Sequence, residues 1–420
     1  MPLYQNDIPL VRPRLSRIDK LGVGVILAGS ALFYISFYID FLSSMSGVFD
    51  WTNHPIGRDF VNMWSGAKVA MQGDVLDLFD VEKFHAWQES FLGQAFPLHN
   101  WSYPPHLLPM IAVLAKLPYV IAYIAFMTVT FLLYAFAARL SGQAGVVAPN
   151  WLMMLALLLA PSTFVTVVAG QNGFLTGALF LAGMLLIERR PWLAGILFGI
   201  LTVKPQLGVM VPIVLIALSA WRPIVSASVT TLVLVGLSMV LFGIHPWESY
   251  LIKTFTLQGD ILTRGDGIYT IMMPTVFMSG RELGLPNAIS WFAQAVSSLA
   301  AVVLTVWALR RPAEPALRLM IICLAVFLVT PYAFNYDMTF LSAALIYYVA
   351  TRDMSAALPF ERLLIGVVWI APYMILPWGN LGFPVVPLFL WAMMGLCCYR
   401  IAKPVEPIAS SARTAAAMTS

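Results

Sequence analysis

The stretch HNWSYPPHLLPMIAVLAKLPY, residues 99–119, determines how the rest of this chain is placed relative to a membrane. Two prolines lead into about a dozen apolar residues, and Lys116 and Pro118 end the run early. A helix over residues 105–117 would rise only about 20 Å, whereas a full crossing takes roughly 20 residues. Whether this short segment crosses or returns to the same side sets the sidedness of every later loop.

The composition places the chain among polytopic membrane proteins. It has 420 residues, of which 60% are hydrophobic and 10% charged, and its mean hydropathy is +0.83. A soluble fold of this length does not bury so many apolar side chains, and backbone groups inside a bilayer are satisfied in helices. The net charge of +4, with scattered basic residues, argues against nucleic acid as a partner. We therefore expect one all-α integral membrane domain over residues 1–420, with membrane lipids around it.

Twelve apolar runs other than 105–117 have the composition of membrane helices. They lie near residues 22–44, 118–138, 151–169, 173–187, 191–204, 206–220, 223–243, 286–309, 317–333, 336–350, 361–378 and 383–401. If 105–117 does not cross, sixteen of the 24 Lys and Arg residues fall on the side of the two termini, and eight fall on the other side. This distribution follows the positive-inside bias, which a crossing at 105–117 would reverse. We therefore predict about 12 transmembrane helices, a re-entrant 105–117, cytoplasmic N- and C-termini, and a disordered cytoplasmic tail over 404–420.

Two long loops are then predicted on the outer side, at 45–117 and 244–285. In the first loop, Phe60, Trp64 and Ala67 recur at helical spacing and form one apolar face. A second stretch, DVEKFHAWQESFLG at 80–93, repeats this pattern. Such helices are typical of segments that lie along a membrane surface.

Polar side chains gather at the predicted outer ends of the spans rather than in their middles. They belong to the motifs GRDFVN at 57–62, AGQNGF at 169–174, VKPQ at 203–206 and PYAFNYD at 331–337. A transporter or lipid flippase, the main alternative class, would be expected to carry ionisable residues in mid-span and two matching halves. An O-antigen polymerase or ligase is a second alternative. The observed placement favours chemistry at the outer membrane surface.

Five motifs in order resemble glycosyltransferase family 87. They are GRDFVNMWSGAKVAMQGD, WSYPPHLLP, AGQNGFLTGALFLAG, LAGILFGILTVKPQLG and TPYAFNYDM, between residues 57 and 338. The family comprises polytopic enzymes of the GT-C superfamily that use polyprenyl-phosphate-linked sugars, and its best-known members are α-mannosyltransferases. The resemblance implies a GT-C-type fold in the bacterial inner membrane, a periplasmic active site, and inverting transfer of a hexose or pentose to a lipid or glycan acceptor.

The resemblance implies a role for Asp59, and the chemistry of the reaction suggests roles for further residues. Asp59, the aspartate ahead of the aromatic-rich helix, would be the general base that deprotonates the acceptor hydroxyl; its simpler explanation is an N-terminal helix cap. The phosphate leaving group needs positive charge and hydrogen-bond donors rather than an obligatory metal, so no cofactor is expected. The candidates for binding the donor phosphate are Lys204, Arg264 and Arg58. The candidates for binding sugar or acceptor are Asn62, Tyr103, His106, Gln171, Asn172, Gln206, Tyr336 and Asp337, and Asp337 is also the alternative base.

Overall fold

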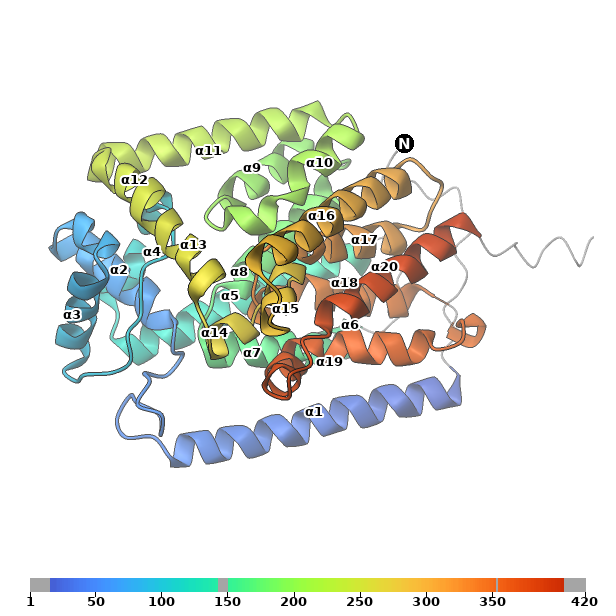
Figure 1. Ribbon diagram of the computed structural model, residues 1–420, viewed down its shortest axis with the longest axis horizontal. Helices are drawn as coiled ribbons and strands as arrows, with labels where there is room; N and C mark the ends of the chain where they lie inside the picture. Colours follow the sequence, from blue (N-terminus) through green and yellow to red (C-terminus); the bar gives the residue numbers. More distant parts are fainter. Residues whose placement is uncertain (1–15, 143–149, 353, 404–420) are drawn as a thin grey trace, which may run out of the picture.

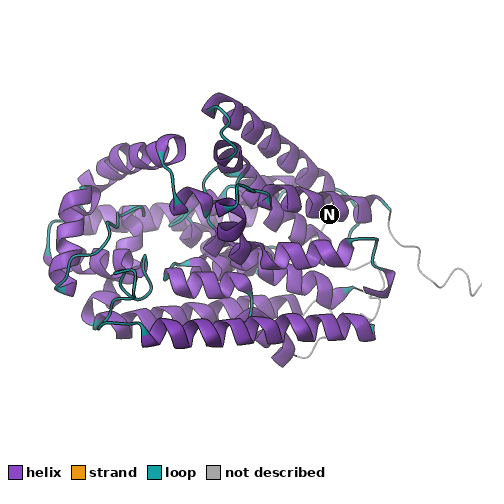
Figure 2. Ribbon diagram, turned by 60° about the horizontal axis from the view of Figure 1, so that its bottom comes forward, coloured by secondary structure: helices purple, strands orange, loops and turns teal. Residues whose placement is uncertain are grey.

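The computed structural model describes residues 16–142, 150–352 and 354–403. The tail predicted to be disordered, 404–420, lies outside the described residues. Within them the chain is helical, as Figure 2 shows, and the only β-type pairings are isolated bridges near Phe49. The predicted all-α architecture is therefore confirmed for the described part of the chain.

The helices follow the predicted division into loops and apolar runs. The N-terminal part contains α1 (Arg17–Ser43), α2 (Phe60–Gln72), η1 (Val75–Phe79), α3 (Val81–Leu92), η2 (Pro105–Leu107), α4 (Leu108–Ile111), η3 (Ala112–Lys116) and α5 (Tyr119–Gly142). The middle contains α6 (Asn150–Leu158), α7 (Pro161–Ala169), α8 (Gly173–Leu186), α9 (Pro191–Leu201), η4 (Pro205–Gly208), α10 (Met210–Ala217) and α11 (Trp221–Phe242). The second long loop contains α12 (His245–Ser249), η5 (Tyr250–Thr254), α13 (Phe255–Arg264), α14 (Ile268–Ile271) and α15 (Val276–Glu282). The C-terminal part contains α16 (Asn287–Leu309), α17 (Pro315–Val329), η6 (Asn335–Met338), α18 (Thr339–Thr351), η7 (Met354–Ala356), α19 (Glu361–Asn380) and α20 (Val386–Ala402).

Five of the described helices are long and apolar enough to cross a membrane: α1, α5, α11, α16 and α19. The helices α6 and α7 qualify as a sixth span if they are taken together, although they are bent by 50° at the break before Pro161. The other predicted runs also fold as helices, but these helices are shorter. The structure thus shows a helical protein with five or six candidate spans, and the count of twelve stays a prediction.

The described ends of the chain lie at one end of the molecule, and the first long loop lies at the other. In Figure 1 the first turn of α1 and the last turn of α20 are on the right, whereas α2, α3 and α12 are together on the left. The second long loop extends from α12 at that end to α14 and α15 near the middle of the molecule (Figure 1), and the side of the membrane on which each end lies stays a prediction.

The segment 105–117 folds as two short 3-10 turns around the single α-turn of α4. Leu107, Leu108 and Ile111 are buried, and the segment packs against α2 within the first loop. The indole nitrogen of Trp64 on α2 donates a hydrogen bond of 3.0 Å to the carbonyl oxygen of Leu117. The segment is too short to be among the candidate spans. The helix α2 is more buried than expected of a helix that only lies along a membrane surface.

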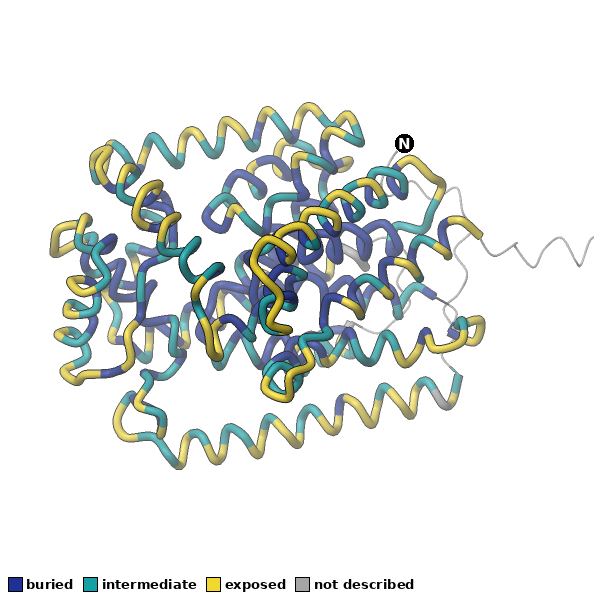
Figure 3. The backbone as a smooth tube through the Cα atoms, in the orientation of Figure 1, coloured by how far each residue is buried: buried dark blue, intermediate teal, exposed yellow. Residues whose placement is uncertain are grey.

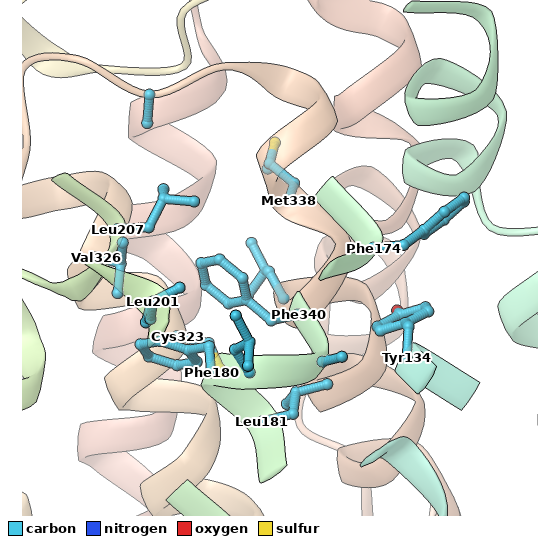
Figure 4. Packing of buried hydrophobic residues seen from close by; sticks show 14 of the residues in the cluster. Tyr134, Phe174, Phe180, Leu181, Leu201, Leu207, Cys323, Val326, Met338 and Phe340 are labelled. Carbon is cyan, nitrogen blue, oxygen red and sulfur yellow. The ribbon is translucent and has the colours of Figure 1, made fainter. Parts of the chain in front are cut away.

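The core lies around α17, in which every residue from Ala316 to Leu328 is buried. Figure 4 shows the packing beside it, with Phe180 of α8 and Phe340 of α18 among the labelled side chains. The ring of Phe340 stacks on that of Phe180 at 4.6 Å and on that of Phe327 of α17 at 5.3 Å between centroids. The helices α1 and α11 lie at the periphery, and Figure 3 shows that most of their residues are exposed or half-buried. Apolar side chains exposed on such long helices are suited to contact lipid.

Candidate active site

A cavity of about 1330 Å³ opens where the two long loops meet the ends of the membrane helices. Its wall is built from the first loop, the α7–α8 turn, the α9–η4 turn, the segment 250–272, the segment 329–336, and α1, α7, α16 and α19. Eight of the predicted site residues line it: Arg58, Asp59, Asn62, Tyr103, Gln171, Lys204, Gln206 and Tyr336. These residues come from positions far apart in the sequence, so the fold brings most of the predicted site together.

Asp59 occupies the N-cap position of α2 but does not cap the helix with its side chain. Instead, its Oδ2 accepts a hydrogen bond of 2.8 Å from the side-chain amide of Gln171, and its Oδ1 lies 3.6 Å from Nε2 of His99. The carboxylate is 27% exposed and faces the cavity. The arrangement presents a proton acceptor to a ligand rather than satisfying the helix end.

A close approach of two glycines positions Asp59 beside Gln171, although the two residues are 112 positions apart. Gly57 has φ +72° and Gly170 has φ +62°, so both adopt the left-handed backbone that glycine tolerates best. A methyl group at Gly170 would overlap the carbonyl group of Gly57. The contact is closed by the backbone N–H of Asp59, which donates to the carbonyl oxygen of Ala169 at 3.1 Å.

Tyr103 fixes the orientation of the Gln171 amide. Its hydroxyl donates a hydrogen bond of 2.9 Å to Oε1 of Gln171, which leaves the amide N–H groups directed at Asp59. Burial and, to a lesser degree, the negative charge of Asp59 raise the pKa of the Tyr103 phenol well above its usual range. The phenol therefore remains a donor at neutral pH. The hydrogen bonds run in one direction, from the Tyr103 hydroxyl to Gln171 and from the Gln171 amide to the Asp59 carboxylate.

Arg58 lines the cavity next to Asp59 and is held from behind by Asp50. Its guanidinium lies 3.2 Å from the Asp50 carboxylate and 3.4 Å from the Thr52 hydroxyl. Burial raises the pKa of Asp50, but hydrogen bonds from Thr52 and from the backbone of His54, together with the charge of Arg58, outweigh burial and lower that pKa overall. Asp50 is thus ionised and anchors the arginine at the cavity wall.

Lys204 is buried at the break between α9 and η4, and it does not extend to the surface as a snorkelling lysine would. Its ammonium donates to Oδ1 of Asp337 at 2.6 Å and to Oδ1 of Asn172 at 3.1 Å. It also lies 4.9 Å from the centre of the Tyr336 ring. Lys204 lines the cavity, whereas Asp337 and Asn172 lie behind it.

Asp337 is fully buried in this ion pair, and its second oxygen accepts the backbone N–H of Phe334 at 3.1 Å. It therefore acts as a partner for Lys204, and unlike Asp59 it does not line the cavity.

Two predicted site residues are placed away from the cavity. The side chain of Arg264 is 80% exposed and forms an ion pair with Asp260 on the same helix at 3.2 Å. His106 is buried, stacks on Trp247 at 5.6 Å between ring centroids, and lies 3.2 Å from the Thr202 hydroxyl. Neither residue lines the cavity.

Asn62, by contrast, reaches the cavity while its Oδ1 accepts a hydrogen bond of 2.9 Å from Gln88.

The sequence reasoning missed two histidines, His54 and His99, that line the cavity near Asp59. Their rings meet edge to face at 5.7 Å. In the described residues no three His, Cys, Asp or Glu side chains are close enough to hold a metal ion. The missed aromatic residues Tyr269 and Tyr332 also line the cavity, with their hydroxyl oxygens 3.0 Å apart.

The fold and the cavity together define a helical membrane protein with an aspartate presented at a ligand-sized pocket. The family model described as glycosyltransferase family 87 matches residues 101–331, more than half of the chain. This protein belongs to that family and is a glycosyltransferase. No curated protein and no solved structure matches it. The matched range includes Tyr103, Gln171 and Lys204, and it begins after Asp59.

Proposed function

We propose that this glycosyltransferase moves a sugar from a polyprenyl-phosphate donor to a hydroxyl of a lipid or glycan acceptor at the periplasmic face of the bacterial inner membrane, with Asp59 as the general base. The observation that carries the proposal is that Asp59 is the one carboxylate among the described residues lining the cavity. A base must lie within hydrogen-bond reach of the proton that it removes, and Asp59 is the described carboxylate that a ligand in this cavity could reach.

The arrangement around Asp59 is suited to a single displacement. Gln171 occupies Oδ2, so the acceptor hydroxyl would approach Oδ1. As the acceptor oxygen bonds to the anomeric carbon, its proton passes to Asp59, and the bond from that carbon to the phosphate oxygen breaks with the electron pair leaving on the phosphate. Attack from the side opposite the phosphate inverts the anomeric centre, which converts a β-linked lipid phosphate to an α-glycoside. Mannose, another hexose or a pentose fits this chemistry, and the step needs no metal.

Two cations are available for the donor phosphate. Lys204 and Arg58 line the cavity, and charge-assisted hydrogen bonds to phosphate are among the strongest that proteins make. An ammonium has three N–H donors, and the two directed at Asp337 and Asn172 leave one for a ligand. The exposed position of Arg264 makes it a poor candidate for this role.

The apolar part of the cavity supports a donor with a lipid tail. Phe37 of α1, Phe164 of α7, and Tyr373 and Leu376 of α19 line this part. α1 contacts the bundle here through aromatic rings, with Tyr34 stacked on Phe164 at 4.7 Å. A cavity that joins polar groups at one part to an apolar wall near peripheral helices matches an amphiphilic ligand better than a free sugar nucleotide.

A transfer assay tests the proposal. Purified protein is incubated with radiolabelled polyprenyl-phosphate sugars and a membrane lipid extract, and Asp59→Asn is compared with wild type. We expect wild-type transfer and a loss of about 100-fold or more in the variant, with donor binding retained. Asp74→Asn is the matched control, because Asp74 caps η1 on the exposed part of the same loop and asparagine also caps.

Full activity of Asp59→Asn would remove Asp59 from the role of base. Absence of transfer from every lipid-phosphate donor, together with lipid flux in proteoliposomes, would instead support the transporter or flippase class.

A further inference from the structure

His99 lies against the oxygen of Asp59 that Gln171 leaves open. Its Nε2 is 3.6 Å from Oδ1 of Asp59, and the ring is almost fully buried at the edge of the cavity. Catalytic hydrogen bonds are often long before substrate binds and tighten in the reacting complex. The distance is therefore compatible with a direct contact once the acceptor is bound.

The second ring nitrogen determines the tautomer of His99. Nδ1 lies 2.7 Å from the carbonyl oxygen of Pro97. A carbonyl only accepts hydrogen bonds, so Nδ1 carries a proton and the neutral ring has its lone pair on Nε2, directed at Asp59. A neutral His99 can thus accept a proton from Asp59, whereas a protonated His99 would form an ion pair that blocks Oδ1.

We propose that His99 is the second proton acceptor of the transfer reaction, an inference that rests on the proposed function. The acceptor O–H bond breaks as the oxygen–carbon bond forms and the phosphate leaves with its electron pair. The proton moves to Oδ1 of Asp59 and then to Nε2 of His99, and the imidazolium releases it to solvent. Asp59 returns to the carboxylate form while the product is still in the cavity.

The other ionisable groups near His99 do not share this geometry. The titratable and charged side chains around it are Asp59, His54, Arg58, Asp50 and, beyond the Phe96 ring, His85. His54 resembles His99 in one respect, because its Nδ1 lies 3.1 Å from the carbonyl oxygen of Thr52. It makes no ion pair with Asp59 within the described residues, and burial and the charge of Arg58 lower its pKa. His54 therefore serves as a matched control for His99.

The test uses His99→Asn in the full-length protein. The asparagine amide can take the place of Nδ1 and keep the hydrogen bond to Pro97, but it has nothing at the position of Nε2. We expect kcat to fall by roughly tenfold or more, with donor and acceptor KM within about twofold. We also expect wild-type kcat to fall as the pH is lowered from about 8 to about 5, because a protonated Nε2 cannot accept the proton, and this dependence to disappear in His99→Asn. His54→Asn should keep it.

The outcomes separate the two proposals. A wild-type rate and an unchanged pH profile in His99→Asn would show that His99 only anchors its loop, and would overturn this inference while leaving Asp59 as base. Loss of the pH dependence in His54→Asn, with retention in His99→Asn, would also overturn it. Failure of wild type to transfer sugar from any lipid-phosphate donor would overturn the proposed function and this inference together.

Discussion

Replacement of Gly170 by alanine should separate Asp59 from Gln171 without touching either side chain. The methyl group would overlap the carbonyl group of Gly57, two residues before Asp59. The backbone N–H of Asp59 donates to the carbonyl oxygen of Ala169, so the two turns are held together at this point. Room for the methyl group can be made only if the α7–α8 turn and the turn before α2 move apart and weaken this hydrogen bond.

The expected magnitude has two parts. Alanine in a left-handed backbone costs about 1–2 kcal/mol, and relieving the overlap adds about 1–3 kcal/mol of overpacking. Restoring ordinary contact requires a shift of about 1.5 Å at the site, and a misplacement of about 1 Å is already enough to lower a rate by about 100-fold. We expect Gly170→Ala to lose activity at temperatures where the protein remains folded.

The control is Gly47→Ala, in the first long loop, which also holds Gly57 and Asp59. Gly47 has φ +63°, almost the same as the +62° of Gly170, but a methyl group there meets no atom within 4 Å. Sugar transfer and thermal unfolding in detergent are measured for both variants. Gly47→Ala should show only the backbone cost and a near-wild-type rate. Equal activity losses in the two variants, or a wild-type rate in Gly170→Ala, would refute the claim that the glycine contact sets the position of Asp59.

Three further perturbations test the charged residues. Lys204→Met leaves the Asp337 carboxylate buried without its partner and should destabilise the protein by about 3–5 kcal/mol. The double variant Lys204→Met with Asp337→Leu should regain thermal stability relative to Lys204→Met but should not regain donor binding. The lowered pKa of Asp50 contributes stability that is present above its unfolded value of about 4 and is lost as pH falls through the folded value. The difference in Tm between wild type and Asp50→Asn should therefore be largest at pH 7 and should shrink as the pH falls below about 4. Arg264→Ala should change stability by less than about 1 kcal/mol and leave the donor KM unchanged, because its ion pair is exposed.

Hydropathy predicted where helices form but not how long each one is. Apolar runs such as 173–187 and 191–204 fold as α8 and α9, which are too short to be candidate spans. Burial within the protein and contact with lipid both select apolar side chains, so composition alone does not separate a short buried helix from a full crossing. The run 151–169, predicted as a single span, folds as α6 and α7 with a 50° bend before Pro161, which the hydropathy pattern did not reveal.

The site was predictable where one residue type had a distinct chemical reason to be there, and less so where a role depends on a distant partner. Asp59, Gln171 and Lys204 were selected individually and do line the cavity. The pairing of Lys204 with Asp337, 133 residues away, has no local signal, and it changes Asp337 from a candidate base to a structural partner. His99 had no signal of its own, because its relevance comes from the Pro97 carbonyl on one nitrogen and Asp59 near the other.

The paired cations bear on how the product leaves. Arg58 and Lys204 face the cavity, but each is bound to a buried carboxylate, Asp50 and Asp337. These partners keep the cations charged and fixed where an unpaired buried charge would be costly, and they also offset much of the positive potential that reaches a ligand. A donor phosphodiester carries one negative charge, whereas a released phosphomonoester carries about −1.5 to −2 at neutral pH. In the proposed reaction the extra charge appears on the face of the sugar opposite Asp59 and gains no further cation. The cavity wall therefore holds the phosphate product less favourably than an array of unpaired basic residues would.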